Sequence, residues 1–492
     1  MSYYVIGIGG SGAKCVEALT HLCAIGMLPA ENLYCIFVDP DRANGSLARA
    51  TVTLRQYQAC NQLQLGDRQS LNIFKTNVST GNPHVWSPFM DKEQPMLADF
   101  FGYNTLKAKN PRAALLFDVL YSDTEKKTSL EMGFRGHPSI GAAIMARTVN
   151  LGEAEPWETF RKKISADATA GQEAKIFLVG SIFGGTGASG FPTIARLIKN
   201  SIKKNEEQYA KIGGALLLPY FSFIPSYKKE EMRAAAENFL MNAQMALHYY
   251  HNRPKQQDII YLLGESNPNQ VRYSLGSSEQ KNEAHFIELY AALAAVDFFT
   301  RKAPQGFSMI AREQNDHIEW NDVPDGNHGD TIKPRLARMA RFAFAYLNVY
   351  VKTLKDIRAG GKSYRAPWYV DYFERNKEMG KAEVDTTLGQ IKEYCESFLL
   401  WLAQMQTSSK RPELKLVNHT PFAEEVKTED GSFARLLPQP REAEFSNLML
   451  PTSAPKPNEL SNIWERVSDM KVRDPHAVGV GKFFHALYKA CE

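Results

Sequence analysis

Two glycine-rich stretches hold the residues best suited to bind an anion. Gly7–Gly12 reads GIGGSG and Phe183–Gly190 reads FGGTGASG; each follows an apolar run and precedes a segment with helical spacing. A loop of this kind gathers backbone N–H groups at the start of a helix, where the helix dipole also favours negative charge. Each stretch therefore predicts a phosphate-binding loop, and two of them at one edge of a sheet would hold a nucleotide from several sides.

The first stretch, taken alone, allows three interpretations. It matches the G-x-G-x-x-G pattern of a Rossmann dinucleotide site, in which Asp39, after the next apolar run, would hold a ribose. It is also close to a P-loop, although Lys14 comes one residue too late and Cys15 stands where a Ser or Thr would hold magnesium. The third interpretation is a tight turn without a ligand. The second glycine-rich stretch favours a nucleotide gripped by more than one loop.

The elements that must position these loops alternate between strand and helix, which predicts an α/β fold with a doubly wound, mostly parallel sheet. The helix expected at 283–301 is apolar on almost every face and should be buried. Strands are expected at 3–8, 33–41, 175–182, 212–220 and 258–264, and helices follow the loops and cover about 230–251.

This pattern divides the chain into three parts. Residues 1–282 are expected to form the nucleotide-binding domain, with an insertion at about 50–130 that breaks the alternation. Residues 283–305 hold the central core helix. Residues 306–492 are expected to be largely helical, with a Pro-rich connector at 437–458.

Composition excludes several classes of function. The chain of 492 residues is 44% hydrophobic and 23% charged with a net charge of +4, and no stretch concentrates Lys and Arg as a nucleic-acid surface would. The 6 cysteines form no C-x-x-C pair and do not cluster with the 11 histidines, so reduced thiols and no zinc are expected. The start has no secretory pattern, and the longest apolar stretch, 214–224, is too short to span a bilayer. A cytoplasmic protein is expected.

Five motifs in order resemble the nucleotide loops of the tubulin/FtsZ superfamily. Residues 184–188 (GGTGA) resemble its signature loop G-G-G-T-G-S-G, with Phe183 and Ser189 as departures. The other motifs are VIGIGGSGAKCVEAL for the first loop, FVDPDRA for the second, GFRGHPSIGAAIMA for the third and LPYFSFIPSYKKEEMRAAAENF for the fifth. The resemblance, which covers about residues 1–300 outside the insertion, is to a divergent bacterial tubulin-like protein. It implies GTP or GDP with Mg²⁺ as cofactors.

The resemblance also assigns contacts to single residues. Glu230 and Arg233 would reach the ribose and base. Phe286 falls where an aromatic ring packs on guanine, and Tyr290 stands where the family has an acid that pairs with the guanine edge. The residues implied at the phosphates and magnesium are Gly9, Gly10, Ser11, Gly12, Asp39, Asp41, Gly133, Gly136, Gly184, Gly185, Thr186, Gly187 and Ala188.

In this superfamily the nucleotide lies between two subunits, and acids that follow the central helix of one subunit polarise water against the γ-phosphate held by the other. The nearest match here is Asp322 and Asp325, for which a solvated acidic loop is the alternative. The resemblance therefore implies a GTP-binding protein that associates head to tail into filaments, with slow or partner-dependent GTPase activity. A nucleotide-regulated adaptor that does not hydrolyse GTP is the second hypothesis. An NAD-dependent Rossmann oxidoreductase is the third, and it leaves Phe183–Gly190 without a role.

The last residues, 481–492, form a short amphipathic pattern. Phe483, Phe484, Leu487 and Tyr488 fall near one face, flanked by Lys482 and Lys489. This face could bind a protein partner or a membrane surface, or it could pack on its own domain.

Overall fold

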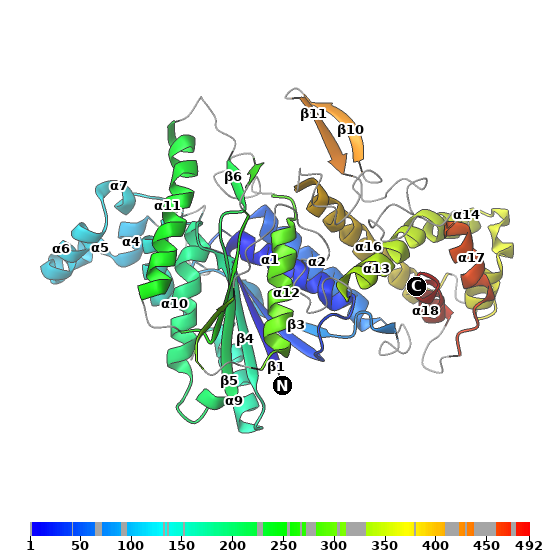
Figure 1. The fold of residues 1–492 in the computed structure, drawn as a ribbon, viewed down its shortest axis with the longest axis horizontal. Helices are drawn as coiled ribbons and strands as arrows, with labels where there is room; N and C mark the ends of the chain where they lie inside the picture. Colours follow the sequence, from blue (N-terminus) through cyan, green and yellow to red (C-terminus); the bar gives the residue numbers. More distant parts are fainter. Residues whose placement is uncertain are drawn as a thin grey trace.

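Seven parallel strands form the central sheet of the computed structural model (Figure 1). Their order is β3-β2-β1-β4-β5-β7-β9, so the winding direction reverses between β1 and β4. In open α/β sheets, ligands bind outside the carboxyl ends of the strands at such a switch point. The strands are β1 (Ser2–Ile8), β2 (Asn32–Val38), β3 (Asn77–Trp86), β4 (Ala174–Ser181), β5 (Ala210–Leu217), β7 (Ile259–Leu263) and β9 (Ser308–Ile310).

The structure describes most of the chain, and the statements below concern that part. The described residues are 2–41, 43–63, 71–89, 96–130, 133–134, 137–150, 153–223, 230–252, 256–265, 268–271, 282–302, 306–310, 331–377, 380–408, 423–428, 431–436, 459–473 and 479–492.

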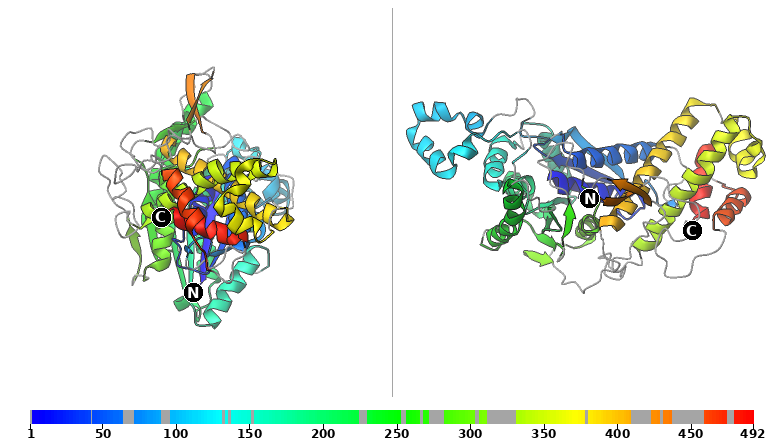
Figure 2. Two further views of the ribbon diagram at one scale, coloured as in Figure 1. Left: turned by 90° about the vertical axis from the view of Figure 1, so that its right-hand side faces the viewer. Right: turned by 90° about the horizontal axis from the view of Figure 1, so that it is seen from above.

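Helices cover both faces of the sheet (Figures 1 and 2). Side chains of β1 alternate between two cores, because Tyr3 and Val5 join the cluster on one face while Tyr4 and Ile6 join the other. The first face carries α1 (Gly9–Ala24), α2 (Gly45–Gln62) and α12 (Phe286–Thr300); the second carries α8 (Pro138–Thr148), α9 (Trp157–Thr169), α10 (Gly185–Ser201) and α11 (Glu230–Asn252). The predicted doubly wound α/β fold is confirmed.

The apolar helix expected at 283–301 is α12, and 12 of its 15 residues are buried. Both of its ends are fixed by side chains. His285 and Glu288 form a capping box at its start. At its end, Lys175 of β4 donates to the backbone oxygens of Phe299 (2.9 Å) and Arg301 (2.7 Å), where a cation also suits the helix dipole.

The segment expected as an insertion, 50–130, divides into two parts. α2 continues to Gln62 and β3 is the edge strand beside β2, so the first part belongs to the sheet domain. The pattern of β3 conceals it because this strand is half-exposed and contains Gly81 and Pro83, which edge strands tolerate. The second part forms α4 (Leu97–Phe101), α5 (Tyr103–Lys109), α6 (Pro111–Leu120) and α7 (Asp123–Lys126), which project from one end of the molecule, cyan in Figures 1 and 2.

The C-terminal region is mostly helical, as predicted, and lies at the opposite end of the molecule (Figure 2). Phe483, Phe484, Leu487 and Tyr488 are at most 2% exposed, so the terminal helix packs on its own chain and does not offer this face to a partner or a membrane. Its helices are α13 (Ile332–Ala345), the π-helical turn η4 (Tyr346–Tyr350), α14 (Val351–Arg358), α15 (Pro367–Tyr369), the π-helical turn η6 (Val370–Glu374), α16 (Ala382–Ser408), α17 (Glu459–Asp469) and α18 (Gly479–Ala490).

A two-stranded hairpin, β10 (Ala423–Thr428) and β11 (Gly431–Leu436), follows α16. A second small sheet pairs β6 (Phe221–Phe223) with β8 (Asn269–Val271). The predicted connector at 437–458 lies outside the described residues. Among the helices that the structure describes, none is long and apolar enough to cross a membrane.

Polar contacts tie the C-terminal helices to α1 and α2. The Arg49 guanidinium of α2 donates to both carboxylate oxygens of Glu17 on α1 and to Gln404 Oε1 on α16. Deeper in the same junction, His21 Nδ1 lies 3.0 Å from the Tyr394 hydroxyl of α16. α16 is therefore held against the helix that begins at the first glycine-rich loop.

Candidate functional site

Four loops meet at the carboxyl ends of β1, β2 and β4. A Cβ atom built on Gly9 would lie 3.3 Å from Thr186 Cβ, so the first and the signature loops are in direct contact. A Cβ atom built on Gly133 would lie 3.6 Å from Pro40 Cγ, 3.9 Å from Asp41 Cβ and 3.9 Å from Thr186 Oγ1. The structure thus brings together Gly9, Asp41, Gly133 and Thr186, which come from four separate motifs.

The helices that follow two of these loops begin without a side-chain cap. The N-cap residues, Ile8 of α1 and Gly184 of α10, form no side-chain hydrogen bond with the first N–H groups of these helices, which begin at Gly9 and Gly185. α2 differs, because Asn44 Oδ1 accepts from the N–H groups of Ser46 (2.9 Å) and Leu47 (3.2 Å). Uncapped N–H groups at two adjacent helix starts, reinforced by both helix dipoles, form an anion-binding arrangement.

Two of the glycines are required by the backbone itself. Gly9 has φ +73°, a left-handed conformation that other residues rarely adopt. A Cβ atom on Gly187 would lie 2.3 Å from the Ser181 backbone oxygen, so glycine lets the first turn of α10 pack directly on β4. Gly9 thus permits the turn into α1, and Gly187 permits the close packing of α10 on β4.

We expect Gly187→Ala to lower the free energy of unfolding by about 1–3 kcal/mol, because the added methyl group would push α10 away from β4. Gly184→Ala is the matched control, since a Cβ atom there meets only the Ser181 hydroxyl, at 3.1 Å. Urea denaturation of both variants measures the difference. Equal midpoints for the two variants would contradict the close approach.

The two departures from the signature loop each have a contact that explains them. Phe183 is 1% exposed and packs against Phe221, with ring centroids 5.3 Å apart. The Ser189 hydroxyl donates to the backbone oxygen of Gly185 at 2.7 Å, within α10 itself. Phe183 therefore packs in the core, and the Ser189 hydroxyl is hydrogen-bonded within its own helix.

Two acids follow β2 and are buried beside the loops. Asp39 is 3% exposed and Asp41 is 5% exposed. Asp39 Oδ1 accepts from the Asp41 N–H group at 3.0 Å, whereas Asp39 Oδ2 has no hydrogen-bond partner within the described chain. Burial is the main cause that raises the pKa of Asp39 to about 8; the backbone hydrogen bond from Asp41 opposes this shift and the nearby Asp41 carboxylate adds to it. A carboxylate pair with an unsatisfied oxygen fits a hard cation such as Mg²⁺.

Lys14 does not act as a P-loop lysine in this arrangement. Its ammonium forms an ion pair with Glu288 of α12, and the two side chains are 3% and 0% exposed. It also donates to the Glu283 backbone oxygen at 3.2 Å. Glu288 further accepts from the Tyr220 hydroxyl at 2.9 Å. This buried network joins α1, the end of β5 and the first turn of α12.

The residues expected at the base lie beside this network, within the core. Phe286 is 1% exposed and Tyr290 is 8% exposed, and both belong to the cluster on the α1 face of the sheet. The ring centroids of Phe286 and His285 lie 4.5 Å apart. Nδ1 of His285 accepts a hydrogen bond from the Ile287 N–H group at 3.2 Å. Burial, aided by the charge of Lys14, holds the pKa of His285 well below its usual range.

Several expected residues are only partly located. Glu230 and Arg233 lie in the first turns of α11. Gly136, Asp322 and Asp325 lie outside the described residues. Gly10, Ser11, Gly12, Gly184, Gly185, Gly187 and Ala188 occupy the loops and helix starts described above.

Sequence analysis missed the network around Glu288, although a signal for it was present. A carboxylate within an otherwise apolar, fully buried helix requires a partner, because an unpaired buried charge is strongly unfavourable. Glu288 is that carboxylate. Lys14, already noted for its awkward P-loop spacing, is its partner.

Comparison with known proteins gives one family-model match and one similar solved structure. Residues 133–348 match the family model described as "Tubulin like". Among solved structures, CetZ2 from Haloferax volcanii in a GTPγS-bound protofilament is similar at 14% identity over 61% of this chain, with a TM-score of 0.28. This chain covers 59% of that chain. No curated protein gives a significant match. The family match takes in the third loop, the signature loop and the central helix.

Proposed function

We propose that the chain binds a guanine nucleotide with Mg²⁺ where the four loops meet. The observation that carries the proposal is the contact between Gly9 and Thr186, because it joins two uncapped helix starts into one anion site. The backbone N–H groups of the first and signature loops would hold the phosphates, with Gly133 and Gly136 beside the γ-phosphate. The guanine would lie toward Glu230, Arg233, Phe286 and Tyr290.

Asp39 and Asp41 are the proposed partners of Mg²⁺. Their buried carboxylates and the unpaired Asp39 Oδ2 supply oxygen ligands of the kind this ion prefers. Bound Mg²⁺ would neutralise part of the phosphate charge. The residues of this chain would fix the acids, since the Asp41 and Ala43 N–H groups already orient the two carboxylates.

We further propose that copies of the chain associate head to tail, so that Asp322 and Asp325 of one copy face the nucleotide of the next. The two acids would polarise water against the γ-phosphate and give slow or partner-dependent GTP hydrolysis. A heterologous contact of this kind produces filaments. The solved structure of CetZ2 is that of a protofilament.

Nucleotide binding is tested with fluorescent GTP and with Thr186→Val, which removes one hydroxyl at the meeting point of the loops. We expect about tenfold weaker binding, the value of one hydrogen bond to a charged phosphate. Thr169→Val is the control, because that hydroxyl only donates to the Ser165 backbone oxygen on α9. Equal binding of ATP, or NAD as the copurified ligand, would overturn the guanine assignment.

Filaments and hydrolysis need separate measurements. Sedimentation and electron microscopy with GTP should show filaments, and phosphate release should fall in Asp322→Ala and Asp325→Ala. A chain that binds GTP tightly but releases no phosphate at high concentration would instead be a nucleotide-regulated adaptor. A strict monomer with and without GTP would overturn the filament proposal.

A further inference from the structure

The backbone just before α12 is held by side chains from α2 and α16. The Arg49 guanidinium of α2 donates to the Asn282 backbone oxygen at 2.9 Å. Gln404 of α16 accepts, through Oε1, from the Ala284 N–H group at 3.2 Å and from Arg49 Nη1 at 3.2 Å. The side chains of Arg49 and Gln404 and the two backbone groups thus form one connected set of hydrogen bonds, here called the α12 clamp.

Arg49 is held firmly within this clamp. Its Nε and Nη2 atoms donate to the carboxylate of Glu17 on α1 at 2.8–3.0 Å. The Glu17 side chain is 2% exposed, and it also accepts from the Thr53 hydroxyl at 3.2 Å. A guanidinium that binds a buried carboxylate in this forked way has little freedom to move. Gln404 is the member of the clamp that the C-terminal helices contribute.

The clamped backbone leads directly into the proposed position of the nucleotide base. Lys14, on the helix that begins at the first phosphate loop, donates to the Glu283 backbone oxygen at 3.2 Å, between the two clamped residues. The next two residues are His285, which caps α12, and Phe286, which begins it. A shift of the clamped backbone would therefore move both rings.

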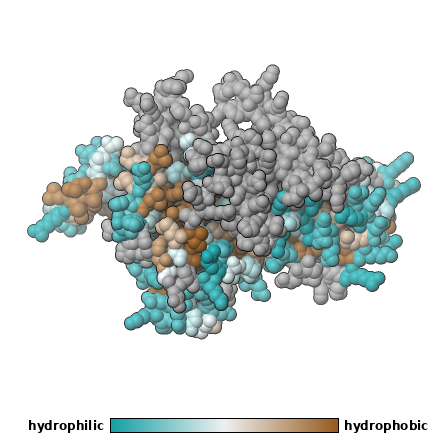
Figure 3. All heavy atoms as spheres, in the orientation of Figure 1, coloured by the Kyte–Doolittle hydropathy of each residue, from teal (hydrophilic) through white to brown (hydrophobic). Residues whose placement is uncertain are grey.

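Apolar packing holds α16 against α1 independently of the clamp. The rings of Phe398 and Trp401 lie on His21 of α1, with centroid distances of 5.4 Å and 4.5 Å. The inner sides of the C-terminal helices belong to the core, whereas the outer surface that they show in Figure 3 is mostly hydrophilic. Loss of the Gln404 amide should therefore leave α16 in place and free the backbone before α12.

We propose that Gln404 is a positioning residue for the nucleotide base. By accepting from Ala284 and Arg49, it fixes the start of α12 and hence the place where Phe286 meets the base. Groups that contact a ligand keep their geometry only when neighbouring contacts hold them. The inference rests on the nucleotide site proposed above and adds a dependence of its base end on the C-terminal helices, while the phosphate end depends on the loops after β1 and β4.

The test compares two variants of Gln404 by isothermal titration calorimetry with GTP and with inorganic tripolyphosphate, both with Mg²⁺. Gln404→Met keeps the length of the side chain but removes the acceptor. We expect it to bind GTP about fivefold more weakly, the value of one hydrogen bond, and tripolyphosphate unchanged. Gln404→Glu keeps an acceptor oxygen for both hydrogen bonds and should bind GTP as the unmodified chain does.

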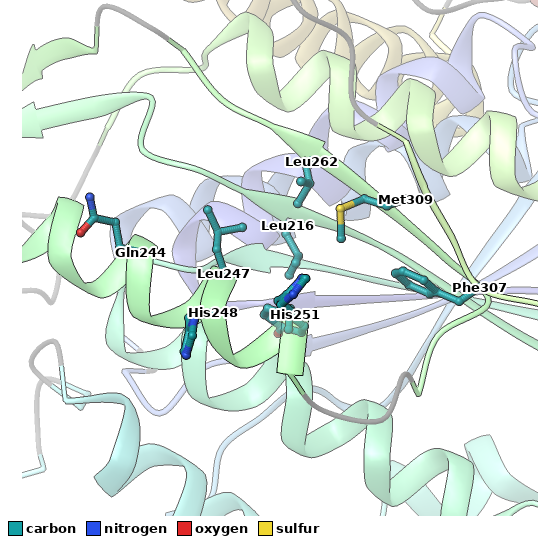
Figure 4. Close-up of a pocket in the computed structure, with 9 residues that line it drawn as sticks. Leu216, Gln244, Leu247, His248, His251, Leu262, Phe307 and Met309 are labelled. Carbon is teal, nitrogen blue, oxygen red and sulfur yellow. The ribbon is translucent and has the colours of Figure 1, made fainter.

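Gln244→Met is the matched control, because it makes the same change at an exposed amide of α11. Gln244 lies beside the pocket between α11 and the edge of the sheet (Figure 4), and this variant should bind both ligands normally.

Three results would overturn the inference and leave the nucleotide site in place. They are normal GTP binding by Gln404→Met, an equal loss of GTP and tripolyphosphate binding in that variant, and weak GTP binding by Gln404→Glu. An unmodified chain that binds neither ligand would overturn the proposed function, and the role of Gln404 with it.

Discussion

Lys14→Met should lower the free energy of unfolding by about 3–5 kcal/mol, the cost of leaving one partner of a buried ion pair without the other. Glu288, with its side chain fully buried, would keep its hydrogen bonds from Tyr220 and from the His285 N–H group but lose the opposite charge. The affected contacts join α1 to α12, so the loss should appear in the cooperative unfolding of the whole sheet domain.

Chemical denaturation measures this effect, and two further variants interpret it. Lys14→Met combined with Glu288→Gln should recover most of the loss, because the unpaired charge is removed. Lys162→Met is the control, since its ion pair with Glu158 is exposed and should be worth less than about 1 kcal/mol. If Lys14→Met kept full stability and lost nucleotide binding, Lys14 would be a phosphate-binding lysine after all.

Asp39→Asn should raise the free energy of unfolding at pH 8 and change it little at pH 4. The folded chain holds the Asp39 proton up to a pKa of about 8, whereas the unfolded chain releases it near 3.8. Between these values the folded state binds more protons, so stability falls as the pH rises and becomes constant above pH 8. At about 1.4 kcal/mol per pH unit the ceiling is about 6 kcal/mol, and a gain of about 2–5 kcal/mol is expected.

The measurement compares urea midpoints of Asp39→Asn and the unmodified chain at several pH values between 4 and 8, without nucleotide or Mg²⁺. The difference should widen as the pH rises. Asp123→Asn, at a carboxylate whose side chain is 91% exposed, should show no such widening. A difference that is the same at every pH would show that Asp39 is ionised throughout.

The strands next to the switch point could be predicted from sequence because each is buried on both faces. β1, β2 and β4 are continuous apolar runs, and glycine follows β1 and β4 where a helix must start close to the strand. β3 could not be found in this way. As an edge strand it pairs on one side only, so its sequence mixes polar residues, Gly81 and Pro83 without an apolar period.

The candidate site shows the same division. Its glycines could be predicted, because they follow from local requirements of the backbone. Three other features depend on segments that lie far apart in the chain: the burial of Phe183, the pairing of Lys14 with Glu288, and the contact of Gly133 with the second loop. A single sequence contains each partner but not the pairing. The C-terminal helices are similar, since their periodicity predicts helices but not the position of α16 on α2.

The junction of Arg49 with Glu17 and Gln404 also bears on whether the C-terminal third can be separated from the sheet domain. One hydrophobic core runs from α1 and α2 through α16 to α18, so the helices after residue 331 form an additional layer over the sheet domain. Removing them would expose the outer sides of α1 and α2 to water. Replacing the C-terminal third with an unrelated module would therefore leave these apolar sides without their partners.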